Sequence, residues 1–345
     1  MIELKDKAKI LIRLPNWVGD VVMATPAILA LIKERPNLEI HFALREHLCT
    51  LIEDFPNVEK IYKIEGKNFF SNFKFLREIR KEKYDVFLVF SKGFRDGLIA
   101  LFSKSVITIG FSVNFRNFLF TNPVEMTDEL WNSHHTLQFF TLVSQFGLKL
   151  EKEKPFLQVG KKEEEESLEI LKEYKLEKKK FVVFHIGASK FPRAYHSERF
   201  GKAAKEISYK KGVDIVLIGS KEDNTYNEIF LKECPNAKNL TGKINLKCLR
   251  AFLSFAALFV GNDSGPMHIA GSVGIPVVAV FGPSNPQKTA PYLDEKKLRI
   301  IYKKLPCSPC RQSFFKDCAP SAAGKPPCLE DIDFQELVTS ALELF

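Results

Sequence analysis

The feature that most constrains the fold of this chain is an alternation between short apolar runs and amphipathic stretches, which occurs twice. In the first half, the apolar runs predict strands and the stretches between them have helical spacing. The predicted strands are Ala8–Leu14, Leu38–Ala43, Val58–Ile64, Tyr84–Phe90 and Val106–Ile109, and the predicted helices are Val21–Glu34, Ser71–Lys83, Gly93–Phe102 and His135–Phe146. This order is typical of a parallel sheet covered by helices.

The same alternation restarts after a charged segment around Gly160–Glu166. The second block predicts strands at Phe181–Ile186, Val213–Ile218, Leu258–Val260 and Val277–Phe281, and helices near Ser197–Lys210, Glu222–Glu233, Leu246–Phe255 and Met267–Val273. A last helix is expected over Phe334–Phe345, with Asp333 as its N-cap. We therefore predict an α/β protein with two Rossmann-like, doubly wound parallel-sheet domains, residues 1–158 and 159–330, followed by a C-terminal helix in 331–345.

Length and composition agree with two globular domains and exclude several classes of protein. The chain has 345 residues, and cores rarely grow to that size without dividing. Its apolar fraction of 45% and charged fraction of 27% exclude a disordered chain. No apolar run approaches the roughly 18–20 residues that span a bilayer, and the N-terminus lacks the apolar core of a signal peptide, so we expect a cytoplasmic protein. The net charge of +9 suits an anionic partner, but no nucleic-acid-binding motif is present.

The first strand-to-helix loop lies in RLPNWVGDVVMATPAI, residues 13–28. Ligands of doubly wound sheets bind at the carboxyl ends of the strands, so the side chains of this loop are candidates for a site. Gly19 permits a tight turn, and Asp20 follows it at the start of the helix. A plain helix cap is the alternative for Asp20. Trp17 favours a site, because core packing does not require a large aromatic ring in this loop.

The most informative stretch is GNDSGPMHIAGSVGIPVVAVFGPSNPQKTAP, residues 261–291. Asp263 follows a buried strand, and Ser264 and Gly265 open a helix. Gly265 permits close approach to free backbone N–H groups, and His268 in the first turn can donate to a phosphate or a hydroxyl. The alternative is an ordinary capped helix with a hydrogen-bonded histidine. The Gly-Pro-Ser turn after the next strand favours phosphate binding.

Two further loops of the second block add candidate ligand groups. The loop after its first strand has small residues followed by Lys190 and Arg193, which suits a diphosphate, although a solvated basic loop is equally compatible. In the loop after its second strand, Glu222 or Asp223 could accept hydrogen bonds from ribose hydroxyls. Capping of the next helix is the alternative, and it is the better explanation for Asp223.

Four cysteines stand near the C-terminus: Cys307, Cys310, Cys318 and Cys328. Four thiolates can form a tetrahedral zinc site, but the spacing of the second pair departs from common zinc motifs. Structural zinc, free thiols and oxidation all stay open, and we predict no metal site. Asp331–Asp333 resembles a metal-binding DxD motif, but it directly precedes the last helix, so capping explains it better.

The stretch Lys67–Arg116 has ten cations against four acids, with phenylalanines interleaved. One interpretation is a solvated helix face over a core rich in phenylalanine. The other is a patch that docks on an anionic lipid surface or binds a phosphorylated acceptor. The residues leave both open.

Together these motifs resemble one family. PNWVGDVVMATPAI at 15–28, GNDSGPMHIAGSVGIPVVAVFGPSNP at 261–286, the loop after Phe184 and the cysteine-rich segment 307–328 are similar to glycosyltransferase family 9, the ADP-heptose:lipopolysaccharide heptosyltransferases, and most similar to the type II enzymes. The resemblance covers nearly the whole chain in the same order. It implies a GT-B fold, two Rossmann-like domains facing a central cleft, with the last helix crossing back to the first domain.

The resemblance also implies an activity: inverting transfer of L-glycero-D-manno-heptose from ADP-heptose to the (heptosyl-)Kdo2-lipid A inner core of lipopolysaccharide. A related transferase with another nucleotide sugar or the first-heptose acceptor is the alternative. A basic, zinc-stapled binding protein without activity is a further one. The implied partners are the ADP-sugar donor, a phosphorylated lipid A–core acceptor and the cytoplasmic face of an anionic inner membrane, with which contact is peripheral.

Residue roles follow from the resemblance by matching position. Asp20 would be the general base that deprotonates the acceptor hydroxyl. The donor would be held by Ser189, Lys190, Arg193, Glu222, Ile244, Asp263, Ser264, Gly265 and His268, with Glu222 on the ribose and Ile244 on the adenine. Arg193 stands where the family usually has a lysine, so Lys190 is the alternative phosphate ligand. No cofactor or metal is implied, because the helix N-terminus and a cation would stabilise the departing diphosphate.

Overall fold

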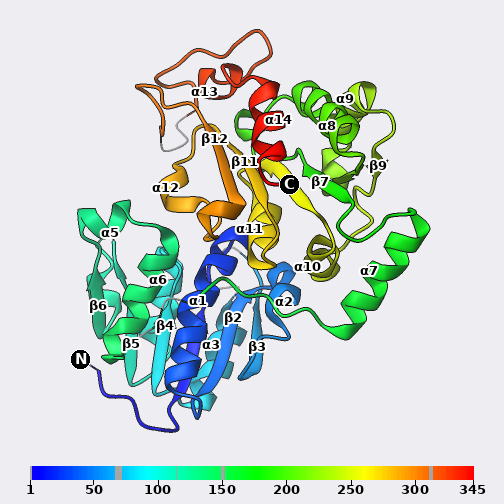
Figure 1. Cartoon of the computed structure of the whole chain (residues 1–345). Helices are drawn as coiled ribbons and strands as arrows, with labels where there is room; N and C mark the ends of the chain where they lie inside the picture. The colour runs from blue at the N-terminus through cyan, green and yellow to red at the C-terminus, as the bar shows by residue number, and fades with distance from the viewer. Residues whose placement is uncertain (1, 67–71, 114, 149–150, 152, 311–313) are drawn as a thin grey trace. The chain divides into compact units, whose positions relative to one another are not determined.

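A computed structural model describes residues 2–66, 72–113, 115–148, 151, 153–310 and 314–345. The chain divides into two compact units, Met1–Gln158 and Val159–Phe345, and each has its own parallel sheet (Figure 1). Within the described ranges, no helix combines the length and the apolar character that crossing a bilayer requires.

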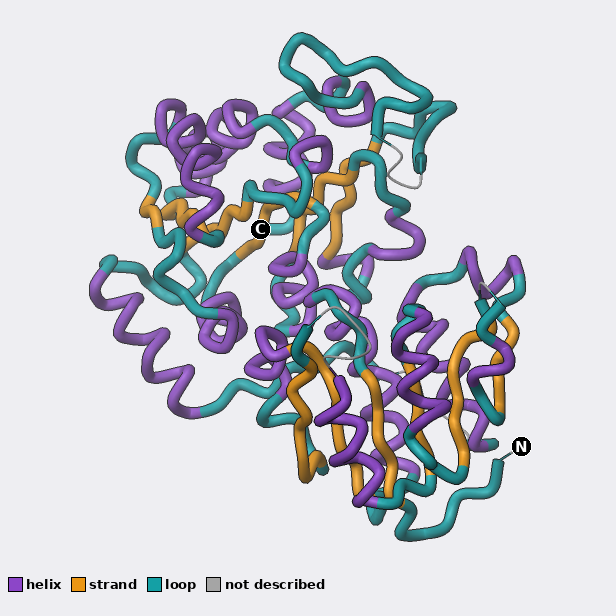
Figure 2. Tube along the Cα trace, turned by 180° about the vertical axis from the view of Figure 1, so that it is seen from behind, coloured by secondary structure: helices purple, strands orange, loops and turns teal. Residues whose placement is uncertain are grey.

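The first unit is a six-stranded sheet in the order β3-β2-β1-β4-β5-β6. Its strands are β1 (Lys9–Arg13), β2 (Glu39–Arg45), β3 (Val58–Ile64), β4 (Val86–Val89), β5 (Ile107–Ser112) and β6 (Asn122–Glu125). Its helices are α1 (Val18–Glu34), α2 (Glu46–Ile52), α3 (Phe73–Glu82), α4 (Phe94–Phe102), α5 (Asp128–Asn132) and α6 (His135–Val143). In two opposite views, helices stand in front of this sheet each time (Figures 1 and 2), so both of its faces are covered.

The second unit repeats this topology, with the order β12-β11-β10-β7-β8-β9. Its strands are β7 (Phe181–His185), β8 (Asp214–Ile218), β9 (Lys238–Asn239), β10 (Leu258–Asn262), β11 (Val277–Phe281) and β12 (Leu298–Tyr302). Its helices are α7 (Lys161–Glu173), α8 (Ser197–Lys211), α9 (Asn224–Glu233), α10 (Leu246–Ser254), α11 (Gly265–Ser272), α12 (Pro286–Thr289), α13 (Pro327–Glu330) and α14 (Phe334–Leu342). Both sheets therefore have the Rossmann strand order, and the predicted α/β fold class is confirmed.

The topology decides where ligands can bind. In each sheet the direction of chain progression reverses between two central strands, β1 and β4 in the first unit and β7 and β10 in the second. The helices that follow these strands leave on opposite faces, which opens a crevice at the carboxyl edge. The loops after these four strands are therefore where a site is expected.

The last helix is part of the core of the second unit. Leu337, Val338 and Ala341 of α14 belong to the core of the second unit, where the helix packs against α8. The apolar face of this helix is therefore covered within its own unit, and the return of the segment to the first domain stays a prediction. Its N-cap agrees with prediction, since Asp333 accepts from the Gln335 backbone N–H and forms a capping box with Glu336.

Candidate functional site

Asp20 lies at the carboxyl edge of the first sheet, in the first turn of α1. The helix begins at Val18, two residues earlier, so Asp20 is not its N-cap. Its Oδ1 lies 3.0 Å from Nδ1 of His135, the first residue of α6, and both side chains are about a quarter exposed. An ionised carboxylate only accepts hydrogen bonds, so Nδ1 of His135 carries a proton and donates it. The other carboxylate oxygen has no partner among the described residues.

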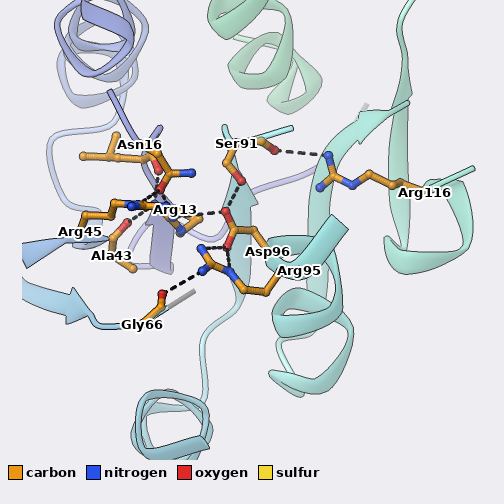
Figure 3. Close-up of polar contacts among 10 residues, drawn as sticks. Arg13, Asn16, Ala43, Arg45, Gly66, Ser91, Arg95, Asp96 and Arg116 are labelled. Carbon is orange, nitrogen blue, oxygen red and sulfur yellow. Dashed lines mark hydrogen bonds and ion pairs between the residues drawn. The ribbon is translucent and has the colours of Figure 1, made fainter. Parts of the chain in front are cut away.

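The loop before Asp20 is held by a buried arginine. Arg13, the last residue of β1, donates through Nη2 to the Asn16 side-chain oxygen at 2.5 Å, and Arg45 donates to the same oxygen at 3.2 Å (Figure 3). A further Arg13 nitrogen donates to the backbone oxygens of Leu14 and Ala43. The loop that leads into α1 is therefore tied to two strands. Trp17, which ends it, is 69% exposed, so core packing does not require its ring.

Asp96 is the carboxylate at the centre of this polar cluster (Figure 3). Its side chain is almost fully buried and accepts from Arg13 at 3.2 Å, from Arg95 at 3.0 Å and from the Ser91 hydroxyl. Burial opposes ionisation, but the Arg13 guanidinium and the Ser91 hydrogen bond together hold the pKa of Asp96 below its ordinary value. The residue is therefore an anion that bridges the loops after β1 and β4.

The cluster carries more positive than negative charge. Arg116 is fully buried, donates to the Ser91 backbone oxygen at 3.4 Å and lies 5.1 Å from the Phe120 ring centre. Its Nε and Nη2 have no hydrogen-bond partner within the part of the chain that the structure describes. A Cβ at Gly97 would lie 2.6 Å from Leu119 Cδ1 and 3.2 Å from that Nη2, so the absent side chain of this glycine leaves room for both residues. Arg13, Arg95 and Arg116 therefore lie around the single carboxylate of Asp96, and Arg45 adds a fourth positive charge through the Asn16 side chain.

In the second unit, an ion pair occupies the crevice between β7 and β10. Arg193, in the loop after β7, donates through Nη2 to an Asp263 carboxylate oxygen at 2.6 Å and to the Asp263 backbone oxygen at 3.0 Å. Its Nη1 lies 3.4 Å from the Ser189 hydroxyl. Asn262 fixes this loop, since it donates to the Ile186 backbone oxygen at 2.7 Å and accepts from the Tyr195 backbone N–H at 2.9 Å. Ser189, Arg193 and Asp263, which were predicted separately, are therefore brought together.

The start of α11 forms the other wall of this crevice. Ser264 is the N-cap and Gly265 the first helical residue, and the Ser264 hydroxyl lies 3.0 Å from Nδ1 of His185. Burial lowers the pKa of His185 well below its ordinary value, so the imidazole is neutral. His268 is buried in the first turn of α11. A helix N-terminus next to an arginine is an arrangement that suits an anion.

The remaining predicted donor residues lie in neighbouring loops. Lys190 is exposed, with its ammonium 5.1 Å from the Phe314 ring centre. Glu222 is exposed in the loop after β8, where a hydrogen bond from Ser220 lowers its pKa. Asp223 forms a capping box with Ser220 in the short 3-10 helix Lys221–Asp223, and it is also the N-cap residue of α9, where its side chain makes no capping hydrogen bond. Ile244 is half-buried in the turn before α10.

Two groups of side chains offer atoms that can ligate a metal ion, the cysteines near the C-terminus and a cluster that includes His41. Within the described ranges the cysteines form no disulfide, and burial together with the neighbouring thiols raises the pKa of Cys328 to about 12. Elsewhere, Glu39, His41 and Glu59 present ligand atoms within 4.8 Å of one another. Lys9 forms an ion pair with the Glu39 carboxylate at 2.6 Å, and His41 lies 3.1 Å from the same carboxylate, so Glu39 already has protein partners.

Sequence reasoning missed several residues of these sites. His135 and Asp96 were never singled out, because their importance depends on neighbours 115 and 83 residues away, Asp20 and Arg13. One signal was available for His135: a second predicted helix begins with it, and helix N-termini gather at the edge of the sheet where ligands bind. His185 carried no signal, since its position at the end of a buried strand is typical of a core residue.

The chain is similar to proteins of known class. The model of the family described as "Glycosyltransferase family 9 (heptosyltransferase)" matches residues 72–317. A "Lipooligosaccharide heptosyltransferase 2" of Campylobacter jejuni is 30% identical, over 97% of this chain and 99% of that protein. Among solved structures, "E. coli ADP-heptose lps heptosyltransferase II" has a TM-score of 0.79 at 23% identity, covering 97% of this chain and 98% of that one. A family 9 glycosyltransferase from Veillonella parvula has a TM-score of 0.85 at 21% identity, covering 99% and 98%.

Proposed function

This chain belongs to glycosyltransferase family 9, the heptosyltransferases, and we propose that it transfers L-glycero-D-manno-heptose from ADP-heptose, with inversion, to the heptosylated Kdo2-lipid A inner core of lipopolysaccharide. The single observation that carries this proposal is the crevice between β7 and β10, where Arg193, Ser189 and the N-terminus of α11 converge. Those groups suit the diphosphate of a sugar nucleotide.

The donor half of the mechanism is electrostatic. As the bond between the anomeric carbon and the diphosphate oxygen breaks, its electron pair goes to the departing ADP. The Arg193 guanidinium and the free N–H groups at the start of α11 stabilise that growing charge without a metal ion. The Asp263 carboxylate holds the Arg193 guanidinium in position. Glu222 binds the ribose of the donor, and Ile244 packs against its adenine.

The acceptor half needs a base. Asp20 accepts the proton of the acceptor hydroxyl while the oxygen of that hydroxyl forms the new bond to the anomeric carbon, on the face opposite the departing diphosphate. The hydrogen bond from His135 fixes one carboxylate oxygen at 3.0 Å, which leaves the other for the acceptor. The excess positive charge around Asp96 attracts the phosphates and carboxylates of an inner-core acceptor. That acceptor carries lipid A, so the enzyme would work in peripheral contact with an anionic membrane.

Calorimetric titration of the full-length protein with ADP, and with GDP and UDP as controls, tests the donor assignment. We expect selective binding of ADP, because ADP is the nucleotide of the proposed donor. A preference for UDP or GDP, or no binding of any of the three nucleotides, would contradict the heptosyltransferase proposal. The assignment of the fold does not depend on this result.

A further inference from the structure

The first unit displays an unusual concentration of apolar side chains on its surface. Between positions 94 and 118, six large apolar residues are at least 45% exposed. We name them the aromatic patch: Phe94, Leu101, Phe102, Val106, Phe115 and Phe118. Phe115 reaches 92% exposure, Val106 71% and Phe118 63%. Single exposed apolar residues are ordinary on a protein surface, but a contiguous group of this size marks an interaction site.

A ring contact and helical spacing connect three residues of the patch. The rings of Phe94 and Phe118 lie 6.4 Å apart, centre to centre. Leu101 is seven residues after Phe94 on α4, so both point to the same side of the helix. The opposite side of α4 holds Ile99 and Ala100, which are buried in the same cluster as Leu119. The core of the unit therefore does not need the exposed residues.

Cations border the patch on the neighbouring helix. Arg80 of α3 donates to the Phe102 backbone oxygen at 2.6 Å, and Val106 bonds through its backbone to Tyr84, next to Lys83. The exposed cations around these contacts are Lys74, Arg77, Arg80, Lys81, Lys83 and Lys104. Among the acids of the described segment 72–113, Glu78 alone is exposed. The acid Glu82 is already paired with Lys9 and Lys60.

From this arrangement we propose that the α3–α4 face of the first unit is the surface on which the protein docks on a bilayer containing anionic lipids. The aromatic patch enters the boundary between headgroups and acyl chains, and the bordering cations contact the anionic headgroups. An anionic bilayer is the partner that fits this face by charge, because the face has six exposed cations and one exposed acid. The proposal rests on the proposed function only for the presence of a lipid-linked acceptor.

Co-sedimentation of the full-length protein with vesicles tests the proposal. We expect binding to phosphatidylcholine vesicles that contain phosphatidylglycerol, a steep loss of binding with added salt, and little binding to phosphatidylcholine alone. The double variant Phe115→Ser/Phe118→Ser should bind the anionic vesicles about tenfold more weakly or worse. The charge-reversal variant Arg77→Glu/Lys81→Glu should lose binding to a similar degree.

Matched controls change comparable side chains in the second unit. Tyr209→Ser removes an aromatic side chain that is 88% exposed, and Lys172→Glu/Lys232→Glu reverses two exposed charges. Both controls should bind like the unmodified protein. Equal losses in the controls, unchanged binding of the patch variants, or no binding of the unmodified protein to anionic vesicles would overturn the proposal.

A second readout separates this proposal from the proposed function. Heptose transfer to a water-soluble, deacylated acceptor should be unchanged in the Phe115→Ser/Phe118→Ser variant, because its side chains lie outside the sites described above. If that transfer falls as much as vesicle binding does, the patch belongs to the acceptor site and the docking proposal is wrong. If the unmodified protein binds anionic vesicles but transfers no heptose, the proposed function fails and the docking surface stands.

Discussion

Asp20 and His135 share a hydrogen bond of 3.0 Å between the carboxylate Oδ1 and the imidazole Nδ1, although 115 residues separate them. The bond joins the first turn of α1 to the first turn of α6, two helices that pack along each other. A carboxylate held through one oxygen keeps the other in a fixed direction. His135 is therefore a positioning residue for the proposed base.

Removal of the His135 donor should lower turnover without weakening substrate binding. We expect His135→Leu to reduce kcat about 10–100-fold with KM and ADP affinity unchanged, because the Asp20 carboxylate loses its fixed orientation. His135→Asn keeps an N–H donor near the same place and should recover most of kcat. Steady-state kinetics of the two variants, with His47→Leu as a control on an exposed histidine, check this. A rise in KM with unchanged kcat would contradict the positioning role.

Arg193 and Lys190 should contribute unequally to ADP binding. Arg193→Ala removes a donor and leaves the Asp263 carboxylate unpaired where the diphosphate is proposed to bind, so we expect ADP affinity to fall about 10–100-fold. Lys190→Ala removes only an exposed cation and should weaken binding about threefold or less. Calorimetry with ADP compares them. The reverse order would show that Lys190 is the phosphate ligand.

Asp96 should matter for stability. Asp96→Ala leaves the Arg13 guanidinium buried without its counter-ion, so the free energy of unfolding should fall by about 3–5 kcal/mol. Asp6→Ala removes an exposed carboxylate of the same unit and should change the free energy of unfolding by about 0.5 kcal/mol or less. Urea denaturation of both variants measures the difference. Equal stability of the two would mean that the buried ion pair has no such role.

Chelation of divalent cations should leave transfer intact. In the proposed mechanism, Arg193 and the N-terminus of α11 supply the positive charge that the departing diphosphate needs, so EDTA is expected to change kcat by about twofold at most. An assay of heptose transfer with and without EDTA checks this. An absolute requirement for Mg²⁺ or Mn²⁺ would contradict the electrostatic account of the leaving group.

Periodicity in the sequence predicted the central elements of both sheets. Buried strands such as β4 and β11 are nearly continuous apolar runs, which is typical of parallel sheets covered on both faces. The elements missed include α2 and β12, which are short although they contain apolar residues, and others with weak patterns. β9 has two residues and β6 is a four-residue edge strand that contains Pro123, while α7 is so rich in lysine and glutamate that its three buried positions give little periodic signal.

The candidate sites were predicted in part, for a physical reason. Loops after parallel strands can be located from sequence, so Ser189, Arg193, Asp263 and Ser264 could be assigned to one edge of one sheet. The pairing of charged side chains could not be predicted from the sequence, because it depends on the geometry of side chains from distant segments. The Arg193–Asp263 ion pair and the cluster around Asp96 became visible only in three dimensions.

The central claim is that Asp20 is the base of an inverting heptosyltransferase, and the Asp20→Asn variant tests it most directly. The measurement is the rate of heptose transfer from ADP-heptose to heptosylated Kdo2-lipid A, together with the dissociation constant of ADP. We predict that transfer by the variant falls about 10²–10⁴-fold while ADP binding stays the same, because the amide cannot accept the acceptor proton. Full transfer activity in Asp20→Asn would contradict this account.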